Sequence, residues 1–365
     1  MKQDDILDAL KVVIDPDFRK NLVELNMIKN IVIDGKRVAF DLELTTPACP
    51  IREKLRSECV EAVKSKFEDA NVEVNLTSNV TTKRNSNINI LPNVKNIICV
   101  ASGKGGVGKS TVSVNLAVGL AKTGAKVGLI DADIHGPSIP LMLGIKNERP
   151  VVREIKGKHY LKPVEKHGIS VLSIGVIVDE RQAVVWRGPM VTSALKQFVT
   201  DVLWGNIDYL IMDLPPGTGD VHLTMVQTVP VTASIIVTTP QQVAMADARK
   251  AISMFRMPNI NVPIIGLIEN MSYFTPEDMP DKKYHIFGEG GGKKLADEYE
   301  IPFLGELPII SEICSGGDNG LPTVDSTSSP ILKASWKQIV ERTAQQLAMR
   351  NANLEPTKIV EVTNY

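Results

Sequence analysis

The chain has 365 residues, of which 43% are hydrophobic and 23% are charged, and its formal net charge is −1. The length makes two domains the first expectation, and the composition is typical of a globular protein with a buried core. Because the charges nearly cancel, nothing global favours nucleic acid or a membrane as a partner, and we expect neither. No signal peptide and no run of about 20 apolar residues is visible, so we expect a cytoplasmic protein.

Residues 1–78 are predicted to form a small α+β domain. Apolar side chains recur there first at helical spacing and later with the alternation of strands. The Asp34-Gly35 pair suits a tight hairpin turn between two strands. The expected elements are a helix over residues 6–14, strands over 30–33 and 37–45, a helix that opens at Pro50, and a strand over 72–76.

Residues 79–94 are polar and rich in asparagine, which is typical of a linker. From residue 95 to residue 350, strand-like and helical stretches alternate, as they do in a parallel sheet covered by helices on both faces. Residues 151–178 interrupt this alternation and are predicted to be an inserted hairpin region, and residues 351–365 a polar tail. The strands are expected at residues 96–101, 126–131, 209–213, 234–239, 263–269 and 303–306.

A phosphate-binding loop is predicted between the first of these strands and the helix that follows it. Residues 103–110 read Gly-Lys-Gly-Gly-Val-Gly-Lys-Ser and satisfy the pattern G-x-x-x-x-G-K-[ST]. Glycines let backbone N–H groups converge on phosphate oxygens, and the N-terminus of the helix adds positive potential. Lys109 is expected to reach the β- and γ-phosphates, and Ser110 to offer its hydroxyl to Mg²⁺.

The same glycines also match G-x-G-x-x-G, the dinucleotide-binding fingerprint, through Gly103, Gly105 and Gly108. Asp131 lies near the place where such a fold carries its ribose-binding acid. We prefer the phosphate-loop interpretation, because a lysine and a serine directly after the last glycine serve a phosphate and a metal.

Acidic residues end two other predicted strands. Asp213 closes an apolar strand and precedes Leu-Pro-Pro-Gly, which suits a Walker B carboxylate that holds Mg²⁺ through water. Asp131 and Asp133 follow the strand that begins at Lys126 and could orient the attacking water. Helix capping is the alternative role for Asp133. The expected fold is α/β, a P-loop NTPase with a mainly parallel sheet between helices, preceded by a small α+β domain.

The loop also carries a second lysine, Lys104, which is the extra lysine of the deviant Walker A motif. The large block resembles the superfamily of MinD, ParA and the nitrogenase iron protein. More narrowly it resembles the Mrp/ApbC family of iron–sulfur cluster carrier ATPases, and residues 1–78 look like the iron–sulfur-assembly domain that often precedes this ATPase. The segments that carry the narrower resemblance are Asp15–Asp17, Thr45–Pro50, Asp131–Ser138, Asp213–Asp220, Thr239–Ala244 and Ile268–Ser272.

The resemblance implies a homodimeric, Mg²⁺-dependent ATPase that works with assembly factors and delivers iron–sulfur clusters to apoproteins. Lys104 would cross the dimer interface to the partner's nucleotide, Asp133 would position water, and Asn270 would read adenine. The implied catalytic residues are Lys104, Lys109, Asp133 and Asp213, and the implied magnesium ligands are Ser110 and Asp213. The implied nucleotide-binding residues are Gly103, Lys104, Gly105, Gly106, Val107, Gly108, Lys109, Ser110, Thr111 and Asn270.

The sequence departs from the family in its cysteines. Members usually carry Cys-x-x-Cys soon after Glu-Asn-Met-Ser, yet no cysteine occurs here between Cys99 and Cys314. The usual bridging cluster, with two thiolates from each subunit, therefore cannot form at that segment. Cys49 matches the family cysteine of the N-terminal domain and is expected to be exposed just before a helix, where a thiolate is favoured. Cys49 and Cys314 are the candidate cluster ligands, and Cys59 and Cys99 are expected to pack in the core.

Three functions remain open at this point. The first is an ATPase that carries clusters, and the second is an ATP-dependent adaptor that recruits iron–sulfur clients without holding a cluster. The third is a ParA- or MinD-like positioning switch that binds DNA or a membrane. For the membrane version, residues 331–350 would have to form a basic amphipathic helix. Their polar face is mixed in charge, and a helix that docks on the protein is the simpler interpretation.

Overall fold

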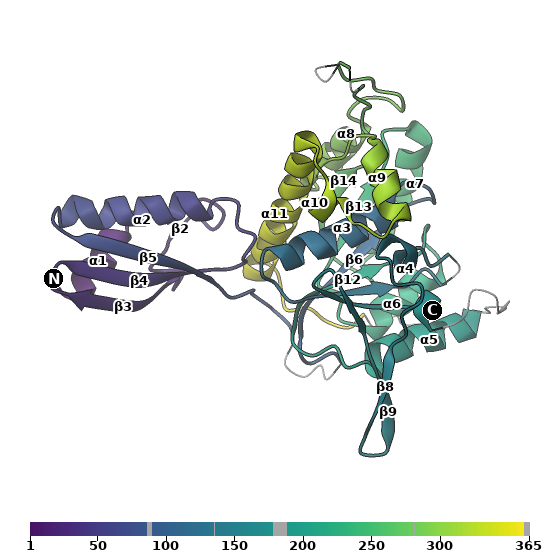
Figure 1. The fold of residues 1–365 in the computed structure, drawn as a ribbon, viewed down its shortest axis with the longest axis horizontal. Helices are drawn as coiled ribbons and strands as arrows, with labels where there is room; N and C mark the ends of the chain where they lie inside the picture. The colour runs from purple at the N-terminus through teal and green to yellow at the C-terminus, as the bar shows by residue number, and fades with distance from the viewer. Residues whose placement is uncertain (86–89, 135, 178–187, 277, 280–281, 361–365) are drawn as a thin grey trace.

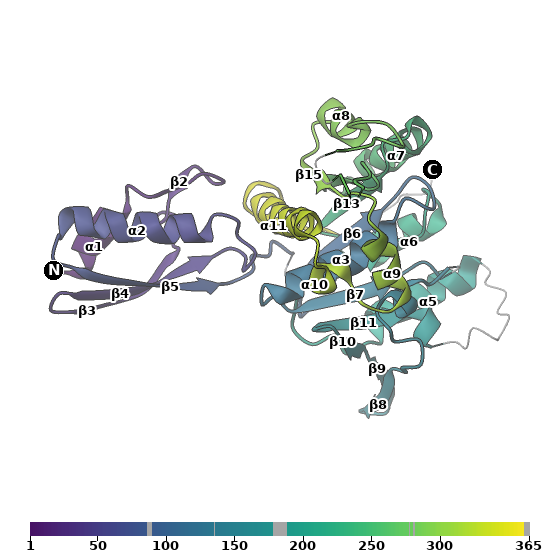
Figure 2. The same cartoon turned by 45° about the horizontal axis from the view of Figure 1, so that its top comes forward.

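The computed structural model describes residues 1–85, 90–134, 136–177, 188–276, 278–279 and 282–360. The chain forms two lobes, which lie side by side in both views (Figures 1 and 2). We call residues 1–78 the N-terminal lobe and residues 90–360 the large lobe. Among the described residues, no helix is both long and apolar enough to cross a membrane.

The N-terminal lobe is a three-stranded sheet with two helices. Strands β3 (Ile28–Asp34) and β4 (Arg37–Leu44) form the expected hairpin, and β5 (Asn71–Ser78) pairs in parallel with β4. Gly35 in the hairpin turn has a φ of 56°, which glycine adopts without strain. The other elements are α1 (Gln3–Leu10), β1 (Ile14–Asp15), β2 (Lys20–Asn21) and α2 (Arg52–Lys66). Helix α1 is shorter than expected, because Ile14 pairs with Asn21 in a short strand.

The large lobe contains the predicted, mainly parallel sheet. Its order is β10-β11-β7-β12-β6-β13-β14-β15, and only the pair β10–β11 is antiparallel. Strands β7, β11 and β13 are buried along their whole length, and β6, β12 and β14 at all but one residue, which explains their continuous apolar runs. The strands are β6 (Val94–Ala101), β7 (Val127–Asp131), β10 (Val164–Lys166), β11 (Ile169–Ser173), β12 (Ile207–Asp213), β13 (Ala233–Thr238), β14 (Ile264–Glu269) and β15 (Phe303–Glu306).

The interpretation of residues 151–178 as one inserted hairpin region is wrong in its second half. Strands β8 (Val151–Ile155) and β9 (Lys158–Lys162) do form an exposed hairpin, which projects from the large lobe (Figure 1). Strand β11, however, belongs to the main sheet and pairs in parallel with β7. This strand was not predicted from the sequence, because β11 follows the hairpin and β10 directly. The helix that precedes most strands of a parallel sheet is missing there.

Helices cover both faces of the sheet and enclose two apolar clusters. One cluster holds side chains of α3 (Lys109–Lys122), α4 (Ile139–Met142) and α11 (Pro330–Asn353). The other holds side chains of α5 (Gly188–Thr200), α6 (Asp220–Thr228), α7 (Gln242–Arg256) and α8 (Gly291–Glu298). The short helices α9 (Ser311–Asp318) and α10 (Thr323–Ser326) precede α11. Helix α11 buries Trp336 and Leu347 against the lobe, as expected of a docking helix.

Residues 79–94 and 351–365, expected as linker and tail, meet on the surface of the large lobe. Thr357 forms a bridge with Arg84, and its N–H donates to the carbonyl of Lys83 at 2.7 Å. The Val360 N–H donates to the carbonyl of Val226 on α6. Residues 86–89 and 361–365 of these two segments lie outside the described part of the chain.

Candidate nucleotide site

The predicted site residues gather where three neighbouring strands end. Strands β6, β7 and β12 are parallel, so their carboxyl ends lie at one edge of the sheet. Asp213 is opposite Asp131 in the register of β12 and β7, and it is opposite Val100 in the register of β12 and β6. Ligands of open α/β sheets bind in the crevice outside this edge.

The loop between β6 and α3 has the backbone that a phosphate-binding loop needs. Gly106 and Gly108 each have a φ of 81°, in the left-handed region that favours glycine. Gly108 caps α3, which starts at Lys109, so the N-terminus of the helix faces the loop. A Cβ on Gly103 would lie 2.1 Å from the carbonyl carbon of Asp247, so this position cannot hold a side chain without a backbone shift.

Asp213 is the centre of a buried polar cluster. Its carboxylate pairs with the Lys109 Nζ at 2.8 Å and accepts the Ser110 hydroxyl at 2.6 Å on the same oxygen. The other oxygen accepts the Ser113 hydroxyl, also at 2.6 Å. Asp213 is fully buried and Lys109 nearly so, which makes these charge-assisted contacts strong. The structure therefore brings the predicted phosphate lysine and both predicted magnesium ligands together.

Asp131 is the second buried carboxyl at this edge. The Ser173 hydroxyl donates to it at 2.9 Å, and the Asp133 N–H donates at 3.2 Å. Burial, and next the charge of Asp213, raise the pKa of Asp131 to about 8. Asp133 is only partly buried, so its position is compatible with contact to a ligand in the crevice.

The segment after Asp213 packs on the phosphate-binding loop. The Gly217 N–H donates to the carbonyl of Ser102 at 2.9 Å, and Pro216 lies next to Gly105. Behind this segment, His222 is buried with only 1% of its surface exposed, and its Nε2 has no hydrogen-bond partner among the described residues. Burial is the main cause that lowers the pKa of His222 to about 4, so the ring is neutral near pH 7.

Asn270 supports the loop directly. It follows β14, and its Nδ2 donates to the carbonyl of Val107 at 2.9 Å. A Cβ on Gly108 would lie 2.1 Å from this nitrogen, so the asparagine and the glycine fit against each other. The resemblance assigned adenine recognition to Asn270, and the contact with Val107 gives it a structural role that sequence analysis did not anticipate.

Lys104 and Thr111, the remaining predicted positions, lie at the two ends of the loop. Lys104 is partly buried, and its carbonyl accepts the Ser102 hydroxyl at 3.0 Å. Thr111 lies in the first turn of α3, where its carbonyl accepts the Asn115 amide at 2.8 Å.

Three residues of the site were not predicted from the sequence: Ser113, Ser173 and His222. Ser113 could have been found, because it lies four residues after Lys109 on the same helix face. Ser173 gave no signal, since the strand that carries it was not recognised. His222 follows the Asp213–Asp220 motif but has no spacing that predicts its burial.

The expectation that Cys49 is exposed and favours a thiolate is wrong. Cys49 is partly buried, and burial, together with the charges of Asp15, Asp17 and Glu341, raises the pKa of its thiol to about 11. The turn that holds Cys49 is packed against the large lobe, which the sequence of the turn does not reveal.

Cys59 and Cys99 lie in the core, as expected. Cys314 is exposed on α9, with its thiol 3.7 Å from Asp318 Oδ2. Cys49 and Cys314 belong to different lobes. The described residues contain no group of three or more His, Cys, Asp or Glu that is arranged to hold a metal ion.

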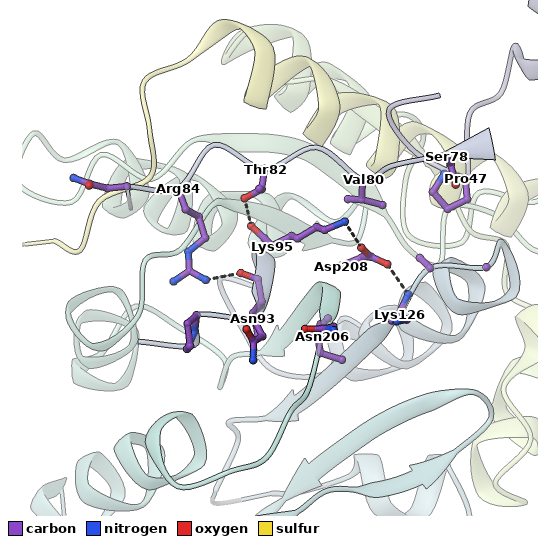
Figure 3. A pocket seen from close by; sticks show the side chains of 16 residues that line it. Pro47, Ser78, Val80, Thr82, Arg84, Asn93, Lys95, Lys126, Asn206 and Asp208 are labelled. Carbon is purple, nitrogen blue, oxygen red and sulfur yellow. Dashed lines mark hydrogen bonds and ion pairs between the residues drawn. The ribbon is translucent and has the colours of Figure 1, made fainter. Parts of the chain in front are cut away.

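A cavity of about 670 Å³ lies elsewhere, at the amino ends of the strands (Figure 3). Its walls include Lys95 at the start of β6, Lys126 before β7 and Asp208 at the start of β12. Because the phosphate-binding loop is at the carboxyl ends, this cavity is not part of the nucleotide site.

Comparison with known proteins agrees with this geometry. Residues 93–344 match a family described as ParA, NUBPL iron-transfer P-loop NTPase, and residues 3–76 match the iron–sulfur cluster assembly protein family. A nucleotide-binding protein from Archaeoglobus fulgidus, solved in complex with ADP, superimposes with a TM-score of 0.57 at 37% identity. That match covers 67% of this chain and 92% of the archaeal one.

Full-length relatives extend the match to both lobes. An iron–sulfur cluster carrier protein of Synechocystis is 48% identical over 92% of this chain and 96% of its own length. The protein of the same description from Deinococcus radiodurans is 41% identical over 98% of this chain and 99% of its own. These matches show that the chain belongs to the NUBPL iron-transfer family of P-loop NTPases and carries an N-terminal iron–sulfur cluster assembly domain.

Proposed function

We propose that this protein is a Mg²⁺-dependent ATPase that works as a cytoplasmic homodimer and carries iron–sulfur clusters to apoproteins. The observation that carries the ATPase part is the cluster of Lys109, Ser110 and Asp213 behind a glycine loop at a helix start. The relatives named iron–sulfur cluster carrier proteins support the proposal that this protein carries such clusters. The four cysteines are too few and too scattered for a disulfide framework, which supports a reducing compartment.

The donor set fits Mg·ATP. Hydroxyl and carboxylate oxygens are the ligands that Mg²⁺ prefers, and the Ser110 and Asp213 side chains share a 2.6 Å hydrogen bond that places both at one point. Bound Mg²⁺ would neutralise charge that develops on the phosphate oxygens. Lys109 now pairs with Asp213, and a triphosphate would offer it a second anionic partner. Backbone N–H groups of the loop and the start of α3 would hold the phosphates.

Two further residues are assigned to hydrolysis. Asp133 is proposed to orient the attacking water from the end of β7, where its partial exposure allows contact with the crevice. Lys104 is proposed to reach the nucleotide of the partner subunit and stabilise charge as the γ-phosphate leaves. Asn270 is proposed to contact adenine, as the family resemblance implies, while its Nδ2 holds the carbonyl of Val107.

The test of the ATPase is Lys109→Ala, compared with Lys122→Ala on the same helix. Lys122 pairs with Asp325 on the surface, so its loss removes a lysine without touching the loop. Calorimetric titration with Mg·ATP and release of phosphate are measured for both. We expect Lys109→Ala to lose hydrolysis and most of the affinity, and Lys122→Ala to match wild type. Unchanged turnover in Lys109→Ala would refute the site.

An adaptor that recruits iron–sulfur clients without holding a cluster is the second candidate. It is favoured by the absence of cysteine between Cys99 and Cys314 and by the covered position of Cys49. Anaerobic reconstitution with iron and sulfide separates the two candidates through charge-transfer absorbance in wild type, Cys49→Ser and Cys314→Ser. Absence of absorbance in wild type would exclude direct carriage and leave the adaptor, while loss in one variant would identify a ligand.

A further inference from the structure

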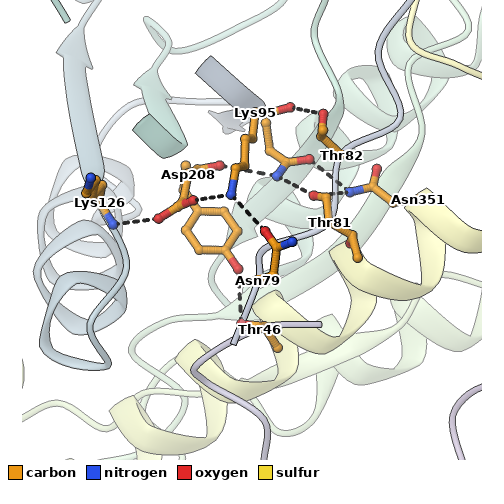
Figure 4. Close-up of polar contacts among 10 residues, drawn as sticks. Thr46, Asn79, Thr81, Thr82, Lys95, Lys126, Asp208 and Asn351 are labelled. Carbon is orange, nitrogen blue, oxygen red and sulfur yellow. Dashed lines mark hydrogen bonds and ion pairs between the residues drawn. The ribbon is translucent and has the colours of Figure 1, made fainter. Parts of the chain in front are cut away.

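The N-terminal lobe touches the large lobe through the turn that holds Cys49. In this turn, residues 45–50, the Thr46 hydroxyl lies 3.0 Å from the hydroxyl of Tyr209 on β12 (Figure 4). Thr46 is 2% exposed and Tyr209 is 1% exposed, so the hydrogen bond is buried between the lobes. Separation of the lobes would replace this hydrogen bond by hydrogen bonds to water, so the net contribution of the bond to docking is modest.

Neighbouring residues of the N-terminal lobe make further contacts with helix α11. Ala48 is buried in the same apolar cluster as Tyr209, Ala344 and Leu347. Asp17 accepts a hydrogen bond of 2.7 Å from the Nε2 of Gln345. The turn is thus held on one side by β12 and on the other by α11.

Cys49 faces the crevice that these contacts close. Asp15, Asp17 and Cys49 from the N-terminal lobe line it together with Gln345 and Ala348 from α11, and its free volume is only about 10 Å³. That is about the space of one water-sized probe, far less than a metal cluster or a protein side chain needs. Burial is the main cause that raises the pKa of Cys49, with smaller contributions from the charges of Asp15, Asp17 and Glu341, and the thiol also packs on the core of its own lobe.

The contact between the lobes is partly polar and leaves unfilled space beside it. Beside it lies the cavity of Figure 3, to which the N-terminal lobe contributes Pro47 and Ser78 and the large lobe Lys95 and Asp208. Lys95 pairs with Asp208 at 3.0 Å and donates to the linker residue Asn79 at 3.2 Å, at the margin of this open space (Figure 4). Domains joined by small, partly polar interfaces move relative to each other by default.

We propose that docking of the turn 45–50 on β12 and α11 is an autoinhibitory contact that encloses the Cys49 thiol, and that release of the N-terminal lobe exposes this thiol to ligands from solution. The proposal adds a closed and an open state of the N-terminal lobe to the function above. It does not depend on ATP hydrolysis or on which group the thiol binds.

The rate at which a maleimide labels Cys49 measures the open state. The experiment uses the full chain with Cys314→Ser, because Cys59 and Cys99 are buried and Cys49 is then the reactive position. Peptide mass spectrometry locates the label. The variant Tyr209→Phe/Gln345→Glu changes only the large lobe, removes both interlobe hydrogen bonds and places a carboxylate next to Asp17. We expect labelling about tenfold faster, from the loss of two hydrogen bonds.

Two further variants test whether a change in labelling comes from the contact with Asp17. Gln346→Glu makes the same change one position along α11, turned about 100° around the helix, and should label like the parent. Gln345→Lys adds a cation opposite Asp15 and Asp17 and should label at least about twofold more slowly. This opposite change keeps the test valid if the double variant folds poorly, which its melting curve and Mg·ATP titration would reveal.

Two results would overturn the proposal. One is that the parent labels at Cys49 as fast as the same chain unfolded in denaturant. The other is that the Gln345 variants label at the parent's rate. Loss of Mg·ATP binding in Lys109→Ala with labelling unchanged would support the closed state independently of the ATPase, so failure of one proposal is distinguishable from failure of the other.

Discussion

Asp131 and Asp213 lie opposite each other on β7 and β12, so two buried carboxyl groups share one edge of the sheet. Asp213 is compensated by Lys109 and by the hydroxyls of Ser110 and Ser113. Among the described residues, Asp131 accepts hydrogen bonds only from the neutral Ser173 hydroxyl and Asp133 N–H, and burial, followed by the charge of Asp213, raises its pKa to about 8. Loss of a proton from Asp131 is therefore opposed near pH 7.

The first prediction is that Asp131→Asn flattens part of the pH dependence of stability. A carboxyl whose folded pKa is raised stabilises the protein below its unfolded pKa, near 3.9, and this contribution is lost as pH rises towards 8. Urea unfolding without nucleotide gives the free energy of unfolding of each protein. The difference between Asp131→Asn and wild type should shift in favour of the variant as pH rises, by at most about 1.4 kcal/mol per pH unit. Asp133→Asn, at a partly exposed position, is the control. A constant difference between pH 5 and pH 8 would contradict the assignment.

The second prediction concerns the close approach of α7 to the loop. Gly103→Ala should destabilise the protein by several kcal/mol, about the range for overpacking, because its Cβ would meet the backbone of Asp247 at 2.1 Å. Gly105→Ala is the matched control, since its Cβ would find only Pro216 at 3.9 Å. Thermal melting of both variants provides the measurement. Equal melting temperatures would show that α7 does not constrain the loop.

Most of the sheet and the phosphate-binding loop were predictable from sequence, because a buried parallel strand leaves a continuous apolar run. β12 is such a run and ends at Asp213, and Lys109-Ser110 then identified the ligand class. Strand β11 was not predictable, since no helix separates it from the hairpin β8–β9. Ser173, which donates to Asp131, was missed with it.

The position of Cys49 could not be derived for another reason. A Pro-Ala-Cys-Pro turn before a helix predicts an exposed thiol when the domain is considered alone. Cys49 packs on the core of its own lobe, and the crevice that it lines is closed by α11, which begins almost three hundred residues later in the chain. The spacing of residues around Cys49 does not predict a contact with α11, which is visible only in the structure of both lobes together.

The third prediction is that His222 lowers the stability of the folded protein in acid. Its pKa is lowered to about 4 by burial, while an unfolded histidine titrates near 6.5. The contribution of neutral His222 to the free energy of unfolding is thus complete above pH 6.5. It is lost as pH falls towards 4, by up to about 1.4 kcal/mol per pH unit. His222→Gln should lack this loss in urea unfolding at pH 7.5, 6 and 5. His159→Gln, on the exposed hairpin strand β9, should retain it. An acid loss that is the same in both variants would show that His222 is not the group responsible.

The fourth prediction is that Lys104→Ala spares nucleotide binding but slows hydrolysis. The lysine is assigned to the partner's transition state, where one lost donor costs about 100-fold in rate. Calorimetry should give an affinity for Mg·ATP close to that of wild type, while phosphate release falls. Lys109→Ala, by contrast, should lose both, because Lys109 lies within its own loop beside Asp213.

Mixing two inactive variants tests whether Lys104 acts across the dimer. Subunits with Lys104→Ala keep Lys109 and Asp213, and subunits with Asp213→Asn keep Lys104. In a mixed dimer, the first subunit's site would receive Lys104 from the second, so phosphate release should return to about half the wild-type rate per mixed dimer. A lysine that acted within its own subunit would leave every site in the mixture defective. Activity that stays at the level of the separate variants, although native mass spectrometry shows mixed dimers, would therefore exclude the trans assignment.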